Sequence, residues 1–127
     1  MRLARTAATV VAAAVVAACS AGTTSTQPST DANLEAGRTL YLQNCASCHG
    51  VDLTGTETGP SFLSIVYEPG HHPDVAFHLA VTRGVQSHHW TFGPMPPVPG
   101  LGDTDIAAIV AYVRQVQQQE GFEPYPP

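Results

Sequence analysis

The sequence predicts a small all-α domain, and three observations support that prediction. Residues 34–44 and 105–118 repeat apolar side chains at the three- and four-residue spacing of a helix with one buried face. Residues 73–83 show a shorter pattern of the same kind. No stretch alternates apolar and polar residues as a half-buried strand would, and 11 glycines and 11 prolines divide the rest of the chain into loops.

Length and charge restrict the function classes. The chain has 127 residues, which is enough for one domain, and a formal net charge of −5 with arginine as its only strongly basic residue. An acidic surface disfavours binding to nucleic acid and to anionic lipid headgroups. A domain of this size buries a limited share of its surface, so a large group bound at its centre would add to a marginal apolar core.

Residues 1–18 have the pattern of a secretory signal peptide. A positively charged start precedes an apolar run over residues 7–18, which is shorter than the roughly 20 residues that span a bilayer. Residues 16–19 read Val-Ala-Ala-Cys and resemble the lipobox of bacterial lipoproteins, in which the cysteine receives a diacylglyceryl group. This resemblance predicts lipidation of Cys19. The alternative is an ordinary signal peptide with a cysteine near its cleavage site.

Residues 19–33 are predicted to form a flexible linker, because they are rich in Ser, Thr, Gly and Ala. A flexible chain of this length reaches about 20 Å, so a lipid on Cys19 would hold the domain close to the membrane. Removal of residues 1–18 also removes Arg2 and Arg5, which changes the formal net charge from −5 to −7. Such a surface suits a partner that presents a basic docking patch.

The first helix is expected over residues 34–44. Gly37 and Tyr41 lie on one of its faces, and Asp31 or Asn33 is the expected N-terminal cap.

The next segments are a loop and a short helix. Residues 51–67 contain two glycines, a proline and several hydroxyl residues, which favour a loop. Residues 73–83 are expected to form a helix with Pro73 at its first position and Gly84 at its end.

The last helix has the clearest pattern. Residues 87–102 are too rich in Gly and Pro to be regular, and residues 105–118 then repeat Ile and Val at helical spacing. Asp103 and Asp105 stand at the N-terminal end, where the helix dipole favours negative charge. Residues 121–127 are expected to be a disordered tail.

A cysteine motif carries the expected chemistry. Residues 45–49 read Cys-Ala-Ser-Cys-His, the C-x-x-C-H signature of covalent c-type haem attachment. Cys45 and Cys48 would form thioethers with the haem vinyl groups, and His49 would become the proximal iron ligand. The third cysteine, Cys19, is already explained by the signal boundary. The predicted cofactor is one covalent haem c.

Two other uses of a C-x-x-C pair fit less well. A zinc site would need further ligands, but the sequence has no second C-x-x-C, and His71 and His72 fall outside the usual finger spacing. A thioredoxin-like redox pair would follow a strand, whereas a predicted helix precedes this one.

Residues 34–118 resemble a class I cytochrome c, with matching features in the same order. Residues 37–41 resemble the family's first helix and residues 106–113 its last, and Gly37 would allow these two helices to cross closely. The resemblance implies the small cytochrome c fold. In that fold the N- and C-terminal helices cross, and a short middle helix and loops wrap around one haem. The domain would cover residues 34–120.

Residues 59–63 read Gly-Pro-Ser-Phe-Leu and resemble the family's Gly-Pro-x-Leu stretch. The resemblance implies that the carbonyl of Pro60 accepts a hydrogen bond from Nδ1–H of His49. That bond would orient the ring and raise its basicity as a ligand. The leucine-like position falls at Phe62 or Leu63, and a simple turn proline is the alternative reading.

Met95 is the only methionine of the mature chain, and it lies in a proline-rich loop before the last helix. The family takes its sixth iron ligand from such a loop, so the resemblance implies His/Met ligation, which raises the potential relative to two histidines. A methionine that only fills a gap in the core is one alternative. Ligation by His88 or His89 is another.

Other residues receive broader assignments. We expect His71, His72 and His78 to lie at the surface. Trp90 and Phe92 are expected either to line the haem pocket or to pack in the core. Arg83 and Arg114 are expected to contact a haem propionate or to form a solvated salt bridge.

With both axial positions filled, the iron has no site for a substrate, which predicts a single-electron carrier rather than an enzyme. The expected location is the outer face of the cytoplasmic membrane or the periplasm, with a lipid anchor in the membrane. The resemblance implies redox protein partners, namely a quinol-oxidising complex, a dehydrogenase or a terminal oxidase, and no nucleic acid. Two alternatives remain: a haem subunit of a larger dehydrogenase or oxidase complex, and a peroxidase-like or gas-binding protein with an open iron.

Overall fold

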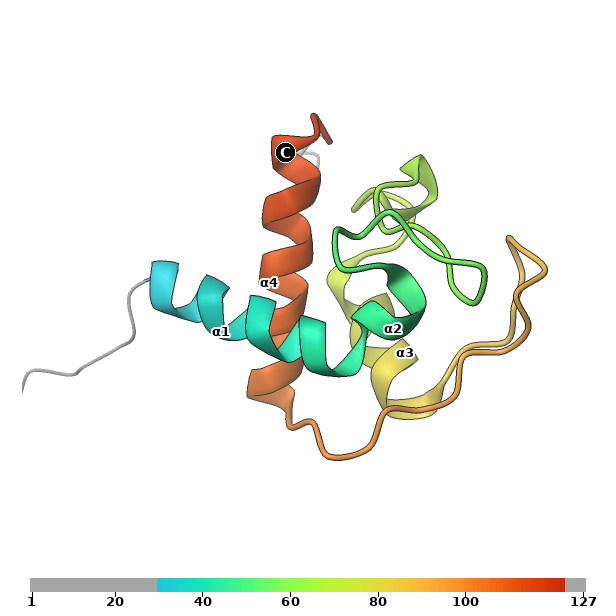
Figure 1. The fold of residues 1–127 in the computed structure, drawn as a ribbon, viewed down its shortest axis with the longest axis horizontal. Coiled ribbons are helices and arrows are strands. Elements are labelled where there is room, and N and C mark those ends of the chain that lie inside the picture. Colours follow the sequence, from blue (N-terminus) through green and yellow to red (C-terminus); the bar gives the residue numbers. More distant parts are fainter. Residues whose placement is uncertain (1–29, 123–127) are drawn as a thin grey trace, which may run out of the picture.

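Helices make up all the regular structure in residues 30–122, the part of the chain that the computed structural model describes. In chain order the elements are α1 (Thr30–Asn44), α2 (Ala46–His49), the 3-10 turn η1 (Ile65–Tyr67), α3 (Asp74–Arg83) and α4 (Asp103–Gln119) (Figure 1). The predicted all-α class is therefore confirmed. None of the helices within the described range is long and apolar enough to cross a membrane. The predicted signal peptide, most of the predicted linker and residues 123–127 lie outside that range.

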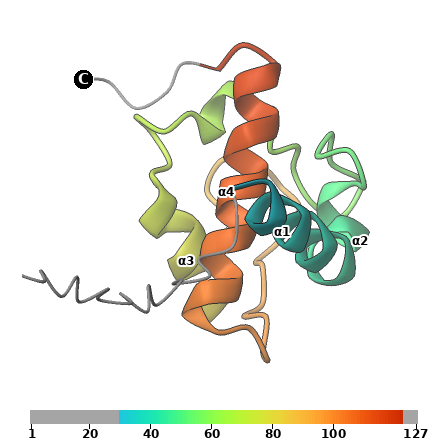
Figure 2. The ribbon, with the colours of Figure 1, turned by 90° about the vertical axis from the view of Figure 1, so that its left-hand side faces the viewer.

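α1 and α4 cross in direct backbone contact (Figures 1 and 2). A β-carbon added to Gly37 would clash with the carbonyl oxygen of Ala108 and would lie 2.6 Å from its carbonyl carbon. It would also lie 3.2 Å from Cβ of Tyr112. Only a residue without a side chain fits at this distance, so the close crossing inferred from Gly37 is confirmed.

The apolar core lies between the crossing helices, α3 and the loop that follows α2. Its buried members are Tyr41, Ala46, Leu53, Phe62, Phe77, Val81, Ile106, Ile109, Val110 and Val113. Both isoleucines and two of the three valines, Val110 and Val113, come from one face of α4, as the three- and four-residue spacing predicts, and Val81 comes from α3. α4 is thus the element on which the other parts of the domain pack.

Two helices begin earlier than expected. α1 starts at Thr30, so residues 30–33 belong to the helix and not to the linker. Asp31 stands in its first turn, where the helix dipole favours a carboxylate. α4 starts at Asp103, two residues earlier than expected, because the carboxylate of Asp105 accepts a hydrogen bond from the N–H of Gly102 at 3.0 Å and so caps the helix at Gly102.

α3 begins one residue later than expected. Pro73 is its cap and not its first residue. The predicted stop at Gly84 is confirmed, because φ of Gly84 is 76° and its N–H bonds to the carbonyl of Ala80 at 2.9 Å.

The C-terminal end of α4 corrects the predicted tail. The N–H of Gly121 bonds to the carbonyl of Gln118 at 3.1 Å, and the N–H of Phe122 bonds to that of Gln117 at 2.9 Å. With φ of Gly121 at 89°, these two bonds form a Schellman motif. Residues 121 and 122, which the sequence assigned to a disordered tail, therefore close the helix.

Arg114 ties α4 to α3 and to the segment before it. Its guanidinium donates to the carboxylate of Asp74 at 2.8 Å, to the carbonyl of Tyr67 at 2.7 Å and to Oε1 of Gln117 at 2.7 Å. It also donates to the carbonyl of His72. Only 11% of the Arg114 side chain is exposed, so a mostly buried network stands where the sequence suggested a propionate contact or a solvated salt bridge.

The α1–α4 crossing yields a stability prediction. Replacing a helical glycine by alanine normally stabilises a helix by roughly 1 kcal/mol. At Gly37 the added methyl group would force the helices apart, so Gly37→Ala should lower the free energy of unfolding by about 1–3 kcal/mol, measured by urea titration. The control is Gly70→Ala, because no atom lies within 4 Å of a β-carbon at Gly70. A Gly37→Ala variant as stable as the control would contradict the crossing.

Candidate functional site

A cavity of about 330 Å³ opens on one side of the core, between α3, α4, the 45–49 turn and the loop that follows α3. Most of its wall is apolar and comes from aromatic and aliphatic side chains. Six thiol, imidazole or thioether side chains also line it: Cys45, His49, His72, His88, His89 and Met95. The cavity therefore combines an apolar wall with sulfur and imidazole nitrogen atoms that can bind a metal, which suits an apolar cofactor that contains a metal.

The cysteine motif forms a helical turn directly after α1. The N–H groups of Cys48 and His49 both bond to the carbonyl of Cys45, at 3.1 and 3.0 Å. Cys45 and His49 line the cavity, whereas Cys48 is exposed and is not among the lining residues. Both cysteines are free, and burial, with a smaller effect from Cys48, raises the pKa of the Cys45 thiol to about 11. Neither thiol is committed to a disulfide.

His49 is held by a single hydrogen bond in a buried position. Its side chain is buried, and Nδ1 lies 2.9 Å from the carbonyl oxygen of Pro60, as the resemblance implied. A carbonyl can only accept, so Nδ1 carries the proton and donates, and Nε2 carries the lone pair. Burial lowers the pKa of His49, which favours the neutral ring that a metal needs.

Phe62 packs flat on the imidazole of His49. The ring centroids are 4.1 Å apart and the planes differ by 16°. Phe62 is buried and also contacts the rings of Tyr41, Tyr67 and Phe77. Phe62, one of the two candidates for the leucine-like position, is therefore the one that packs on the His49 ring, and it limits rotation of that ring. The sequence offered two candidates there and could not distinguish them.

Met95 lines the cavity and lies in a loop whose position is fixed by backbone hydrogen bonds of Met95 itself. Its N–H and carbonyl exchange two hydrogen bonds of 2.9 Å with Val85. A β-carbon on Gly84 would lie 2.6 Å from the Met95 carbonyl oxygen, and φ of Gly84 is 76°, so the two segments approach closely only because Gly84 is a glycine. The sequence predicted only a proline-rich loop here and not this pairing. Its only signal in the sequence is Gly84 beside Val85.

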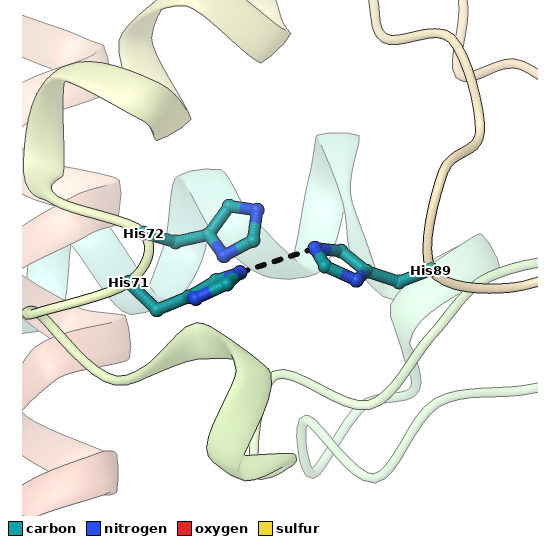
Figure 3. Close-up of side chains that lie close together, drawn as sticks. All are labelled: His71, His72 and His89. Atoms are coloured by element: carbon teal, nitrogen blue, oxygen red, sulfur yellow. Dashed lines mark hydrogen bonds between the residues drawn. The ribbon is translucent and has the colours of Figure 1, made fainter.

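The histidines are less dispersed than the sequence suggested. His71, His72 and His89 come together, and their nearest ligand atoms all lie within 4.8 Å of one another (Figure 3). His78 is apart from them and lies 3.0 Å from the carboxylate of Asp103. His71 is exposed, as expected of a surface residue, whereas His72 and His78 are half-buried, and nothing in the sequence indicated that His71 and His72 meet His89.

The two aromatic residues expected at the pocket do line it. Trp90 and Phe92 both face the cavity, and Trp90 stacks on Tyr67 with centroids 5.6 Å apart. Phe92 is 41% exposed and so lies where the cavity meets solvent. Arg83, for which a propionate contact was one option, is exposed and is not among the lining residues.

Tyr41 links the buried core to the C-terminal end of the cysteine motif. Its side chain is fully buried, and its hydroxyl donates to the carbonyl of Gly50 at 2.6 Å, one residue beyond His49. Burial raises the pKa of Tyr41 far above its ordinary value, so the hydroxyl remains a donor. The residue joins the core to the turn that presents His49.

Comparison with known proteins adds an independent finding. The family model described as Cytochrome c matches residues 34–117. The subunit CcoP of a cbb3-type cytochrome c oxidase from Rhodobacter capsulatus is 30% identical over 93 residues, which are 71% of this chain and 31% of that protein. Cytochrome c oxidase subunit 2 from Alkalihalophilus pseudofirmus is 29% identical over 93 residues, 66% of this chain and 26% of that protein.

A small protein is similar over nearly all of its length. Cytochrome c-554(547) from Halothiobacillus neapolitanus is 31% identical over 87 residues, which are 65% of this chain and 94% of that protein. The chain thus spans less than a third of the oxidase subunits it matches, and it matches the small cytochrome almost from end to end.

Removal of the Tyr41 hydroxyl tests the support of the site. Tyr41→Phe keeps the ring but leaves the Gly50 carbonyl with only the N–H of Leu53 at 3.3 Å, so the free energy of unfolding should fall by about 0.5–1.5 kcal/mol in a urea titration. Tyr112→Phe is the control, because Tyr112 is only partly buried and packs on the same ring at 5.5 Å. An equal decrease in the free energy of unfolding in the two variants would show that the hydrogen bond from Tyr41 to Gly50 does not stabilise the domain.

Proposed function

The chain belongs to the cytochrome c family, and from this premise we propose that it is a mono-haem electron carrier whose iron is ligated by His49 and Met95. Membership implies a covalently bound haem c and a role in electron transfer, and one haem is consistent with the short domain. The observation that carries the proposal is that His49 and Met95, which are 46 positions apart in the sequence, line the same apolar cavity.

The residues of the motif fit covalent attachment. Cys45 and Cys48 are both free and stand on one helical turn, and Cys45 is at the cavity wall. We assign them as the two thioether positions. When bound, the haem supplies a reversible one-electron couple at its iron. The apolar wall excludes water from that couple and so contributes to setting its potential.

His49 fits the role of proximal ligand. The carbonyl of Pro60 accepts a hydrogen bond from Nδ1–H of His49, so Nε2 is the nitrogen available to a metal. Phe62 lies flat against the ring and limits the orientations that the imidazole can take. Both contacts restrict the orientation of the imidazole.

Met95 fits the role of sixth ligand. The two bonds to Val85 fix its main chain, and its thioether is the only one in the described chain. A ligand fixed in this way favours a closed iron, which supports electron transfer over the peroxidase-like or gas-binding alternative. His88 and His89 also line the cavity, so they are the rival ligands that an experiment must separate.

The partners are inferred from the cavity rim and from the relatives. Leu79 and Phe92 line the cavity while 39% and 41% exposed, so they offer an apolar contact where the cofactor edge would lie. The acidic chain favours a partner with a basic patch around that contact. A terminal oxidase is the partner that the oxidase-subunit relatives support, and a quinol-oxidising complex or a dehydrogenase is the expected donor.

The same relatives support a second candidate, a haem subunit of a larger oxidase or dehydrogenase complex. In that case the chain would remain bound to its partner. The match over nearly the whole of a small cytochrome favours the separate carrier.

The proposed location is the outer face of the cytoplasmic membrane or the periplasm. Residues 1–18 would be a lipoprotein signal peptide, and Cys19 would carry the lipid. Because α1 begins at Thr30, the linker after Cys19 would be residues 20–29, with a reach of about 18 Å. The domain would stay near the membrane and could rotate to present its cavity rim to an electron donor and then to an acceptor.

Substitution of Met95 tests the ligand assignment. Met95→Leu keeps the volume but removes the sulfur, so the weak red sulfur-to-iron absorption band should disappear and the midpoint potential should fall by on the order of 0.1 V. His88→Ala and His89→Ala, each made alone, should keep the band. The measurement is a redox-poised visible spectrum of the haem-loaded protein.

The opposite pattern would reject the assignment. A band that survives in Met95→Leu and is altered in a histidine variant would make that histidine the ligand. A pigment that acidified organic solvent extracts from the unmodified protein would reject covalent attachment through Cys45 and Cys48.

Substitution of Cys19 tests the anchor. In Cys19→Ala no diacylglyceryl group can attach, so the protein should move from the membrane fraction to the soluble extracytoplasmic fraction of fractionated cells. Ser20→Ala, the neighbouring control, should stay with the membrane. Equal membrane retention of both variants would refute the lipid anchor.

A further inference from the structure

Three imidazoles form a cluster beside the cavity, and two of them also line it. The proposed ligation by His49 and Met95 does not use them. His71 and His72 stand just before α3, and His89 stands on the facing loop that leads to Met95 (Figure 3). His71 and His89 are exposed, so an ion can reach them from solvent, and His72 is half-buried behind them.

The spacing of two of these rings matches that of metal ligands. Nε2 of His71 and Nε2 of His89 are 3.3 Å apart. Two nitrogens bound to one tetrahedral zinc at about 2.0–2.1 Å are separated by about 3.3–3.4 Å. The ligand atoms of all three residues lie within 4.8 Å of one another, so the third imidazole reaches the same ion after a movement on the order of 1 Å.

The third ring is already oriented by the protein. Nδ1 of His72 lies 2.7 Å from the carbonyl oxygen of Val66, so Nδ1 donates and Nε2 keeps its lone pair. A carbonyl that fixes one ring nitrogen so that the other can bind is the usual arrangement around a metal-binding histidine. His88 has the same arrangement, with Nδ1 2.9 Å from the carbonyl of Gln86 and its ring 4.3 Å from that of His89.

The charges around the cluster are compatible with a cation. Arg114 donates to the main-chain carbonyl of His72, but its guanidinium is paired with Asp74 at 2.8 Å. Burial lowers the pKa of His72, and His71, His88 and the positive charge of Arg114 lower it further, while the hydrogen bond to Val66 raises it. Burial and then the neighbouring imidazoles lower the pKa of His89. Both rings therefore favour the neutral form that carries a lone pair.

We propose that His71, His72 and His89 bind one divalent late transition-metal ion, with water or His88 as the remaining ligand. Imidazole nitrogens suit Zn²⁺ and Cu²⁺, whereas the hard ions Mg²⁺ and Ca²⁺ prefer oxygen. The bound ion joins the segment before α3 to the loop that carries Met95. It also places positive charge beside the cofactor cavity of an otherwise acidic domain.

The test uses the haem-loaded protein without a polyhistidine tag. Titration calorimetry with Zn²⁺ should show one ion bound per chain, and His71→Ala and His89→Ala should each weaken binding at least tenfold. The control is His78→Ala, which removes a histidine whose side chain is 40% exposed and which lies on α3 beside Asp103, and this variant should bind zinc as the unmodified protein does. His71→Ala should keep the haem spectrum, because His71 does not line the cavity.

A second measurement needs no substitution. The electron paramagnetic resonance spectrum of one equivalent of Cu²⁺ on the unmodified protein should show hyperfine structure from imidazole nitrogens. Absence of saturable zinc binding, unchanged binding in the His71→Ala/His89→Ala double variant, equal loss in His78→Ala or a copper spectrum without nitrogen coupling would each overturn the proposal. These results concern zinc and copper alone, so the ligation of the haem iron is tested separately by Met95→Leu.

Discussion

The contact between Gly37 and the backbone of Ala108 is the constraint on which the rest of this domain depends. It sets the distance between α1 and α4, and the Cys45–His49 turn continues directly from the end of α1. α4 supplies Ile106, Ile109, Val110 and Val113 to the cavity wall. One missing side chain therefore positions the attachment motif against the surface that a cofactor would contact, because a larger residue would separate the two helices.

Two independent clamps hold the proposed ligands. His49 is fixed by the Pro60 carbonyl and by the flat contact with Phe62, and both partners lie in the loop after the motif. Met95 is fixed by its pairing with Val85, which belongs to a different loop after α3. Since the two sets of contacts share no residue, a substitution at Pro60 or Phe62 should leave the backbone hydrogen bonds of Met95 intact, and a substitution at Val85 should leave the contacts of His49 intact.

Some of this structure follows from the sequence and some does not. The apolar spacing in α4 and the stop at Gly84 depend on neighbouring residues, so they could be predicted. The C-x-x-C-H motif is local as well, and it led to the correct family and cofactor. The pairing of Val85 with Met95 could not be predicted, because it joins two loop residues that follow no periodic pattern.

Contacts between distant segments were the least predictable. Arg114 bonds to two carbonyl oxygens, which every residue has, so no residue type in the sequence marks them. His71 and His89 are 18 positions apart and meet only once the loop has folded. The Schellman end at Gly121 was missed for another reason, since a glycine followed by prolines suggests fraying as readily as a closed helix end.

The loop that carries Met95 has a consequence for the speed of electron transfer. Prolines at 94, 96, 97 and 99 have fixed φ angles and no N–H to satisfy, and the hydrogen bonds of Val85, Met95 and Val98 tie the loop to the body at both ends. If Met95 ligates the iron as proposed, such a rigid support would keep its thioether in nearly the same position in both oxidation states. The nuclear reorganisation that accompanies each electron would then be small, which would allow rapid electron exchange during a brief encounter.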